Sequence, residues 1–252
     1  MASTYTFGDG DLARRRLDLL AEVYDRSSRA LLAEVAPEAP ATALDLGCGP
    51  GHTTRMVADV CRPARTIGVD ASARYVDHAR AIIGRPGISF VAHDVTAPPL
   101  PGMPAGLIYA RMLLAHLPAP LDVVARWRTQ LAPGGVVVLE EVEAIEAPPG
   151  VLADYERLVT AVVAGGGGTM AIGPALGAAL GGRSVDVPVD VVDAARMFGL
   201  NLATWGGDAV ARGLATADEV DRLARELAAL AAIGRGTAVV RWVLRQVSAG
   251  PA

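Results

Sequence analysis

LDLGCGPGHTT, residues 44–54, carries three glycines on alternate positions directly after a short apolar run. The pattern predicts a strand that enters a glycine turn, followed by a helix that begins near Thr53. In that arrangement, backbone amides and a helix N-terminus face a ligand at the carboxyl edge of a sheet. A GxGxxG dinucleotide fingerprint would place its third glycine at His52, so the GxGxG present here disfavours a nicotinamide cofactor. A tight turn without a ligand is the competing interpretation, because glycine tolerates positive φ.

Short apolar runs alternate with helical patterns on both sides of this stretch. The alternation predicts parallel strands covered by helices, since a parallel crossover needs a dozen or more residues. We therefore expect an α/β protein with a doubly wound, Rossmann-like sheet and helices on both faces. The expected strands are 43–46, 66–69, 88–92, 106–110, 136–142, 184–192 and 237–247, and the expected helices are 11–35, 53–61, 72–83, 112–117, 121–131, 151–164, 171–180, 193–200 and 216–232.

The order of these segments predicts a single domain over residues 1–252. No long polar linker or internal repeat divides the sequence. An N-terminal helical segment, a cofactor-binding core, helical cap insertions and a last strand are expected at 1–40, 41–145, 146–236 and 237–252, respectively.

Composition and charge indicate where the protein is found and which partners it is unlikely to bind. The sequence is 52% hydrophobic, and it shows neither a signal-peptide pattern nor the roughly 18 apolar residues of a membrane span, so we expect a soluble, cytoplasmic protein with no membrane partner. A net charge of −4 with scattered arginines disfavours nucleic acid as a partner. The one arginine cluster, at residues 14–16, is expected on a solvated helix face. All 23 basic residues are arginine, which excludes a Schiff-base lysine and a Walker A loop.

Two acids follow the next predicted strands. Asp70, in TIGVDAS, comes roughly 20 residues after the glycines, where an acid holds ribose hydroxyls in folds of this kind. Asp94, in FVAHDV, follows the third strand and could meet the edge of a base. An ordinary helix N-cap is the alternative for Asp70. Together, the glycine turn and the two acids predict a nucleoside pocket.

With these features, the sequence resembles the class I S-adenosylmethionine-dependent methyltransferases, especially the small-molecule group that includes the ubiquinone-biosynthesis type. The resemblance rests on LDLGCGPG, GVDAS, HDV, LIYARMLLAHL and LAPGGVVVLEE, and it covers about residues 40–145. It implies a seven-stranded sheet with an antiparallel last strand. It also implies S-adenosyl-L-methionine as the cofactor and a small molecule as the methyl acceptor.

The resemblance assigns a role to each motif residue. Gly47, Cys48, Gly49 and Gly51 belong to the loop at the methionine part of the cofactor, with Asp45 reaching the ammonium through water or a neighbouring group. Asp70 would bind the ribose, and Ala71 would lie beside the adenine. Asp94 would contact the adenine amino group, and Val95 would pack on the face of the ring. The carbonyl of Ala110 and the side chain of Arg111 would lie near the methionine end.

Residues outside these motifs are candidates for the acceptor side. His116 is a candidate base, because its ordinary pKa lies near neutrality, although a histidine that only shapes the loop before Pro118 is the alternative. Met170, Trp205 and Tyr5 are candidate substrate residues, and Tyr155 and Phe198 could line the same cavity or belong to the core. The glycine run 165–168 is either a lid hinge or a surface loop, and Glu140, Glu141 and Glu143 are expected at a solvated strand end rather than in substrate binding.

The sequence thus predicts a methyltransferase that acts on oxygen, nitrogen or carbon of a small-molecule metabolite, without a metal. Two alternatives remain open. One is an enzyme that uses the bound cofactor for a reaction other than methylation, and the other is a non-catalytic partner subunit of the same fold. The acceptor and the oligomeric state stay undetermined.

Overall fold

A computed structural model describes residues 7–234, 236 and 238–252. Its strands are β1 (Thr42–Leu46), β2 (Arg65–Asp70), β3 (Ile88–Ala92), β4 (Ala105–Arg111), β5 (Leu131–Glu146), β6 (Arg183–Asp190) and β7 (Val239–Ala249). Its helices are α1 (Asp11–Val35), α2 (His52–Cys61), α3 (Ala73–Ile82), α4 (Pro120–Arg128), α5 (Val151–Gly165), α6 (Gly173–Leu180), α7 (Val191–Ala211) and α8 (Ala217–Ala232), together with a 3₁₀ turn at Leu114–His116.

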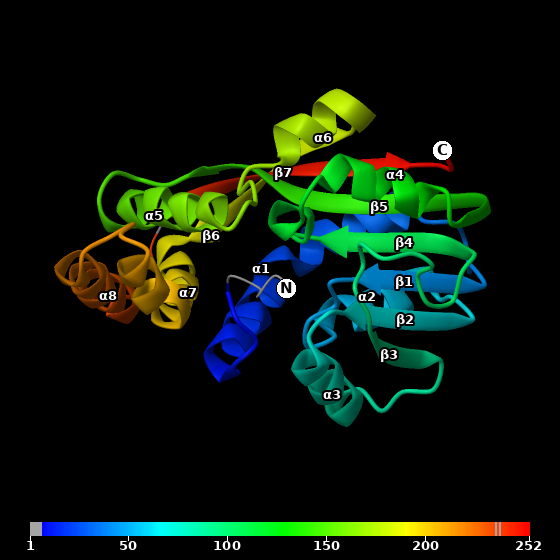
Figure 1. Ribbon diagram of the computed structural model, residues 1–252, viewed down its shortest axis with the longest axis horizontal. Helices are drawn as coiled ribbons and strands as arrows, with labels where there is room; N and C mark the ends of the chain where they lie inside the picture. Colours follow the sequence, from blue (N-terminus) through cyan, green and yellow to red (C-terminus); the bar gives the residue numbers. More distant parts are fainter. Residues whose placement is uncertain (1–6, 235, 237) are drawn as a thin grey trace.

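The strands form one sheet in the order β3-β2-β1-β4-β5-β7-β6 (Figure 1). The pairs among β1 to β5 are parallel, whereas β7 runs antiparallel to both β5 and β6. The chain crosses over between β3 and β4, which places the carboxyl ends of β1 and β4 side by side at a topological switch point. Ligands bind in the crevice at such a point. The expected seven-stranded sheet with an antiparallel last strand is confirmed.

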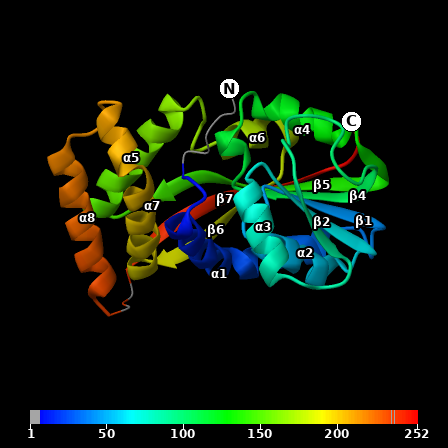
Figure 2. The ribbon, with the colours of Figure 1, turned by 60° about the horizontal axis from the view of Figure 1, so that its bottom comes forward.

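Helices cover both faces of the sheet, as predicted. Figure 2 shows α1, α2 and α3 on one face and α4 and α6 on the other. All five residues of β1 are buried, as expected for a parallel strand enclosed by two helical layers. Within the described ranges, the structure contains no helix that is both long and apolar enough to cross a membrane.

A second cluster of helices lies beyond the parallel part of the sheet. β5 and β7 extend past it, and α5, α7 and α8 gather around this extension at the left of Figure 1. The apolar core there joins Tyr155, Phe198, Trp205 and Trp242, with Tyr155 and Phe198 stacked at a ring-centroid distance of 4.1 Å. Helix α1 contacts both α2 and α7, so it bridges the sheet and the helical cluster.

Three predicted elements differ most from those observed. The helix expected at 112–117 is only a 3₁₀ turn, because Met112 has a φ of +52° and the next two backbone amides donate to Glu141. The strand expected at 136–142 extends over Leu131–Glu146 through its pairing with β4 and β7. The helix expected at 193–200 continues to Ala211 despite three glycines. At Gly206 a β-carbon would lie 2.9 Å from Val220 of α8, so this glycine permits close helix packing.

Candidate functional site

The glycine turn forms the floor of the site. Gly47 and Cys48 donate their amides to the carbonyl of Val69 over 2.8 and 3.1 Å, which holds the turn against the end of β2. Gly47, Gly49 and Gly51 have φ values of +70°, +50° and +94°, a region that disfavours other residues. Glycine is therefore required here by backbone conformation, and the turn brings bare backbone to the carboxyl edge of the sheet.

Asp45 lies beneath this turn. It is 1% exposed and accepts hydrogen bonds from the hydroxyls of Thr53 and Thr54 over 2.7 and 2.6 Å. Burial raises the pKa of Asp45 to about 6. The carboxyl ties β1 to α2 and does not line the cavity, but Thr53 does line it. An indirect contact with a ligand, as the sequence predicts for Asp45, can therefore pass through Thr53.

Asp70 stands at the end of β2, opposite the turn. Its two carboxyl oxygens accept from the amides of Gly49 and Ser72 over 2.9 and 2.8 Å. Burial raises the pKa of Asp70 above its ordinary value, while the two amide bonds oppose that shift. The N-cap of α3 is Ser72 and not Asp70, so the N-cap alternative for Asp70 is wrong.

Asp94 follows β3 and lies farther along the same wall. One of its oxygens accepts from the amide and the hydroxyl of Thr96 over 2.8 and 2.7 Å, and these bonds lower the pKa of Asp94. Val95 beside it is buried, and its carbonyl accepts from the indole of Trp127 over 2.8 Å. An ionised carboxylate and an apolar side chain thus lie next to each other at this end of the site.

A single cavity of about 1120 Å³ joins these residues to the helical cluster. Gly51 and the fully buried Ala110 are not part of its lining, and Tyr5 lies outside the described residues. The predicted residues that line it are Gly47, Cys48, Gly49, Asp70, Ala71, Asp94, Val95, Arg111, His116, Met170 and Trp205. Phe198 lines it as well, whereas Tyr155 belongs to the core.

Glu140 and Glu141 are both fully buried, so the expected solvated strand end is wrong for them. Glu140 accepts from the Tyr109 hydroxyl and from Gln246 over 2.6 and 2.8 Å. One oxygen of Glu141 accepts from the amides of Leu113 and Leu114 over 2.8 and 2.7 Å. The tertiary fold buries these acids because β7 pairs along β5 and the loop after β4 folds over the strand end.

Glu141 also faces the cavity and has an unusual protonation equilibrium. Its second oxygen has no hydrogen-bond partner among the described residues, and burial raises the pKa of Glu141 to about 7. The acid therefore changes charge near neutral pH while it holds the loop at 113–114.

We expect Glu141 to make the protein less stable as pH rises. Its folded-state pKa of about 7 lies above its ordinary value of 4.5, so its contribution is complete below pH 4.5 and is lost as pH rises through 7. The difference corresponds to roughly 3 kcal/mol of unfolding free energy. The melting temperature should fall between pH 5 and 8, and the fall should be smaller in Glu141→Gln. Equal pH profiles for the two proteins would contradict this assignment.

His116 lies in the 3₁₀ turn, with its ring edge-on to Phe7 at a centroid distance of 5.1 Å. Burial and the nearby charge of Arg16 lower the pKa of His116 to about 3. A neutral imidazole with so low a pKa is a weak base, since general-base catalysis is most effective when the pKa lies near the working pH. His116 lines the cavity, so it can contact an acceptor, but its low pKa makes it poorly suited to remove a proton from one.

Arg16 corrects the expectation that the arginine cluster lies on a solvated face. Its exposed fraction is 6%, its guanidinium lies 4.9 Å from the centre of the Phe7 ring, and it lines the cavity. Arg15, its neighbour, is exposed. Arg16 stands one helical turn from the buried Leu20, so helical periodicity could have identified it.

The glycine run 165–168 packs against the same loop. Gly165 ends α5, and a β-carbon at Gly168 would lie 2.3 Å from the carbonyl oxygen of Ala115. That carbonyl also accepts from the amide of Thr169 over 2.9 Å. The run therefore connects the helical cluster directly to the loop that carries His116.

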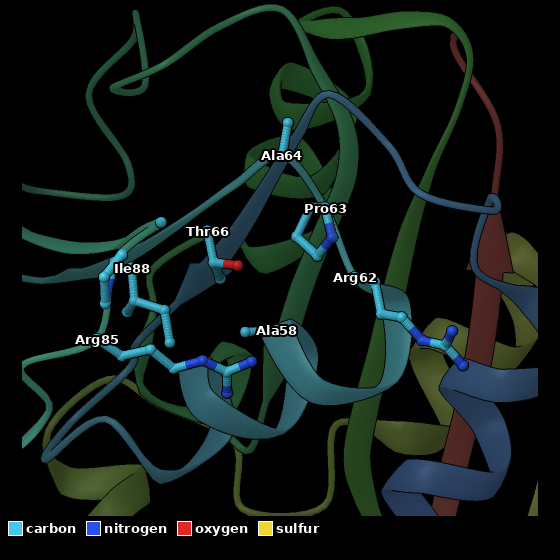
Figure 3. Close-up of a pocket in the computed structure, with 9 residues that line it drawn as sticks. Ala58, Arg62, Pro63, Ala64, Thr66, Arg85 and Ile88 are labelled. Carbon is cyan, nitrogen blue, oxygen red and sulfur yellow. The ribbon is translucent and has the colours of Figure 1, made fainter.

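A second hollow, of about 200 Å³, lies at the opposite edge of the sheet, beside the starts of β2 and β3. Figure 3 shows Arg85 reaching across it toward Ala58, while Arg62 points away. Arg85 is ion-paired with Asp59. This hollow is remote from the glycine turn and the acids, so the large cavity is the candidate site.

Comparisons with known proteins show which family the sequence is similar to. Residues 43–135 match the methyltransferase domain family. The trans-aconitate 2-methyltransferase of Methylobacterium radiotolerans is 38% identical over 157 residues, which are 62% of this chain and 57% of that protein. The trans-aconitate 2-methyltransferase of Azoarcus sp. is 35% identical over 46% of this chain and 44% of its own length. The chain thus spans about half the length of the relatives it matches.

Solved structures extend the likeness in fold beyond the matched region. A putative methyltransferase from Bacillus halodurans superposes with a TM-score of 0.55 over 90% of this chain and 100% of its own, at 16% identity. A methyltransferase from Geobacter sulfurreducens, solved in complex with S-adenosyl-L-homocysteine, gives a TM-score of 0.51 over 88% of this chain and 89% of its own, at 19% identity. The fold of this chain is that of the class I methyltransferases.

Proposed function

We propose that this chain, which carries a class I S-adenosylmethionine-dependent methyltransferase domain, transfers the methyl group of S-adenosyl-L-methionine to a small molecule. One observation supports the proposal most strongly. The glycine turn, Asp70 and Asp94 line one wall of a cavity that continues without interruption into the helical cluster. Its volume of about 1120 Å³ exceeds that of most single-ligand sites, so it has room for a nucleoside and an acceptor together.

The donor side of the cavity suits S-adenosyl-L-methionine. Asp70 offers carboxylate oxygens to ribose hydroxyls, and Asp94 beside the apolar Val95 offers an acceptor and a flat contact to adenine. The positive φ values of Gly47 and Gly49 let the chain approach the amino-acid part of the molecule without side chains in the way. We assign Cys48, Ala71 and Arg111, which line the same cavity, to this ligand.

S-Adenosyl-L-methionine supplies an electrophilic methyl group on a sulfonium centre. The protein contributes by holding the acceptor in line with that group, which removes much of the entropic cost of a reaction between two molecules. Leu113, Ala115 and His116 form the wall between the glycine turn and the helical cluster. Glu141 keeps this wall in place through the amides of Leu113 and Leu114.

Titration calorimetry and a product assay test the proposal. The protein should bind S-adenosyl-L-methionine and should release S-adenosyl-L-homocysteine when a suitable acceptor is added. Trans-aconitate, taken from the names of the relatives, is the first acceptor to try. Binding without S-adenosyl-L-homocysteine release from any acceptor would favour a different reaction of the bound cofactor. Failure to bind would favour a non-catalytic subunit.

We expect turnover to be independent of divalent metal. Metal-dependent sites gather several oxygen ligands around the ion. Across the described residues, the structure contains no group of three or more histidine, cysteine, aspartate or glutamate side chains arranged to hold a metal. Activity should be the same before and after treatment with EDTA. Loss of activity with EDTA and its recovery with magnesium would show that a metal ligand set has been missed.

A further inference from the structure

We propose that the acceptor is an uncharged aromatic molecule whose rings bind in the part of the cavity formed by α1, α7 and β7. The inference rests on the proposed methyl transfer and names the acceptor class for the same cavity. It concerns the body of the acceptor, which the helical cluster encloses, and not the atom that receives the methyl group.

Aromatic side chains are concentrated around this part of the cavity. The sequence contains only three phenylalanines and three tryptophans. Four of these six residues line the cavity, namely Phe7, Phe198, Trp205 and Trp242. They come from the segment before α1, from α7 and from β7, so the tertiary fold collects them from distant parts of the chain. Because aromatic rings attract one another through offset and edge-to-face contacts, such a wall favours an aromatic ligand over a saturated one of similar size.

One face of α7 supplies much of this wall. Met197, Phe198, Asn201, Trp205 and Asp208 all line the cavity, and their spacing of three or four residues places them along one side of the helix. Met197 and Phe198 are 2% and 3% exposed, whereas the side chain of Asp208 is 59% exposed. The enclosed end of this face is therefore apolar, and its polar end opens to solvent.

Helix α1 and three methionines complete the apolar lining. Helices α1 and α7 lie side by side (Figure 2), and Leu17 and Leu20 of α1 line the cavity. The three methionines in the lining are Met112, Met170 and Met197. A thioether side chain is flexible and makes favourable contacts with ring edges. This lining suits a flat hydrocarbon body better than a polar one.

The charges on the cavity wall disfavour an anionic acceptor. Arg111 donates to the hydroxyl of Ser28 over 3.0 Å. Arg212 donates to the carboxylate of Asp208 over 3.0 Å and to the carbonyl of Val162 over 3.3 Å. An acceptor carboxylate would have to compete with these partners, and burying an anion without a cationic partner is costly. A tricarboxylate such as trans-aconitate would bring three anionic groups to this cavity.

Arg16 disfavours a cationic acceptor. Its guanidinium lies over the Phe7 ring at 4.9 Å from the centroid and is also engaged elsewhere in the chain. Burial and the charge of Arg16 disfavour the protonated form of His116, which lowers the pKa of this histidine to about 3. A cation on the acceptor would meet the same repulsion, which is strong where the effective dielectric constant is low. The lining therefore favours a body without charge of either sign.

Binding measurements on the protein saturated with S-adenosyl-L-homocysteine test the acceptor class. The uncharged aromatic probe is 2-naphthalenemethanol. Its comparisons are the anionic 2-naphthoate, the cationic 2-naphthylmethylammonium, the saturated decahydro-2-naphthalenemethanol, and trans-aconitate. We expect the uncharged aromatic probe to bind about tenfold or more tightly than each charged compound. It should bind about twofold to tenfold more tightly than its saturated analogue, because that analogue lacks the contacts between rings.

Variants at two lining residues test the assigned surface. Met170 is half-buried, so Met170→Arg introduces a cation without a built-in partner. It should weaken binding of 2-naphthalenemethanol and strengthen binding of 2-naphthoate, while the matched control Met170→Leu should change neither. Phe198→Leu removes a ring and keeps an apolar side chain, so it should reduce the preference for the aromatic probe over its saturated analogue. S-Adenosyl-L-homocysteine affinity should stay the same in all three. If Phe198→Leu fails to fold, Met170→Arg still tests the charge preference.

The outcomes separate this inference from the proposed function. Equal or tighter binding of any comparison compound would overturn the acceptor class, and so would failure of 2-naphthalenemethanol to bind. Unchanged relative affinities in both Met170→Arg and Phe198→Leu would overturn the assigned surface. Methyl transfer to trans-aconitate with a higher kcat/KM than to any uncharged aromatic acceptor would also overturn the inference, while leaving the proposed methyltransferase intact. Failure to bind S-adenosyl-L-homocysteine at all would instead refute the proposed function.

Discussion

Replacing Asp70 with alanine will weaken S-adenosyl-L-methionine binding at least tenfold. Asp70 offers two carboxylate oxygens at the end of β2, and hydrogen bonds to a charged group are each worth about 1.5 to 3 kcal/mol, against the roughly 1.4 kcal/mol that a tenfold change requires. The substitution also leaves the amides of Gly49 and Ser72 without their present acceptor, so the glycine turn loses a support. Titration calorimetry on the folded variant measures the change.

Asp77→Ala is the matched control for this experiment. Asp77 lies on α3, its side chain is 73% exposed, and its ion pair is with Arg80 on the same helix. Its removal deletes one negative charge near the site without touching the cavity. We expect cofactor affinity to stay the same. An unchanged affinity in folded Asp70→Ala protein would instead mean that Asp70 only positions the glycine turn.

Gly168→Ala will lower both stability and acceptor turnover. The new β-carbon would lie 2.3 Å from the Ala115 carbonyl oxygen, so the segment after α5 and the loop before Pro118 must move apart. Overpacking of this kind costs about 1 to 3 kcal/mol. Because Ala115 and His116 line the cavity between the glycine turn and the helical cluster, the acceptor should be misplaced more than the cofactor. Thermal unfolding measures the loss of stability. Comparing the change in kcat/KM for the acceptor with the change in cofactor affinity measures the second effect.

Gly207→Ala controls for the general effect of replacing a glycine. Gly207 is exposed on α7, and a β-carbon there would meet open space. This variant should be unchanged or more stable by up to about 1 kcal/mol, since alanine favours the helix. If Gly168→Ala keeps wild-type stability and turnover, the close packing of Gly168 on Ala115 is not important for either property.

The sequence was sufficient to predict the α/β architecture and much of the donor side of the site. Strands β1 to β3 and helix α1 lie within one residue of their predicted bounds, because buried apolar runs and helical periodicity are local signals. Gly47, Gly49, Asp70 and Asp94 follow strand ends directly, so the sheet topology alone brings them to one edge. Their place in the cavity could be predicted without knowledge of any long-range contact.

The acceptor side could not be predicted in the same way. Glu141 was predicted to lie at a solvated strand end. In the structure it is enclosed, because β7 pairs along β5 and the amides of Leu113 and Leu114 donate to its carboxylate. Arg16 was predicted to be a surface residue because a run of charged residues on a helix is usually solvated. In the structure, however, α1 packs against α7 and Arg16 is buried. Both errors concern the surroundings of a side chain, which depend on segments far away in the sequence.

Local sequence therefore determined the glycine turn, the acids at the strand ends and the alternation of strands and helices, since each depends on φ preference or on a short apolar period. Only the tertiary structure decided which polar groups lie on the acceptor side of the cavity. The protonation of Glu141 and the weak basicity of His116 arise from desolvation and from charges on other elements. The burial of Arg16 arises from the packing of distant segments around it. Desolvation is a property of the whole packed chain, because it depends on how much water the surrounding elements remove from each group.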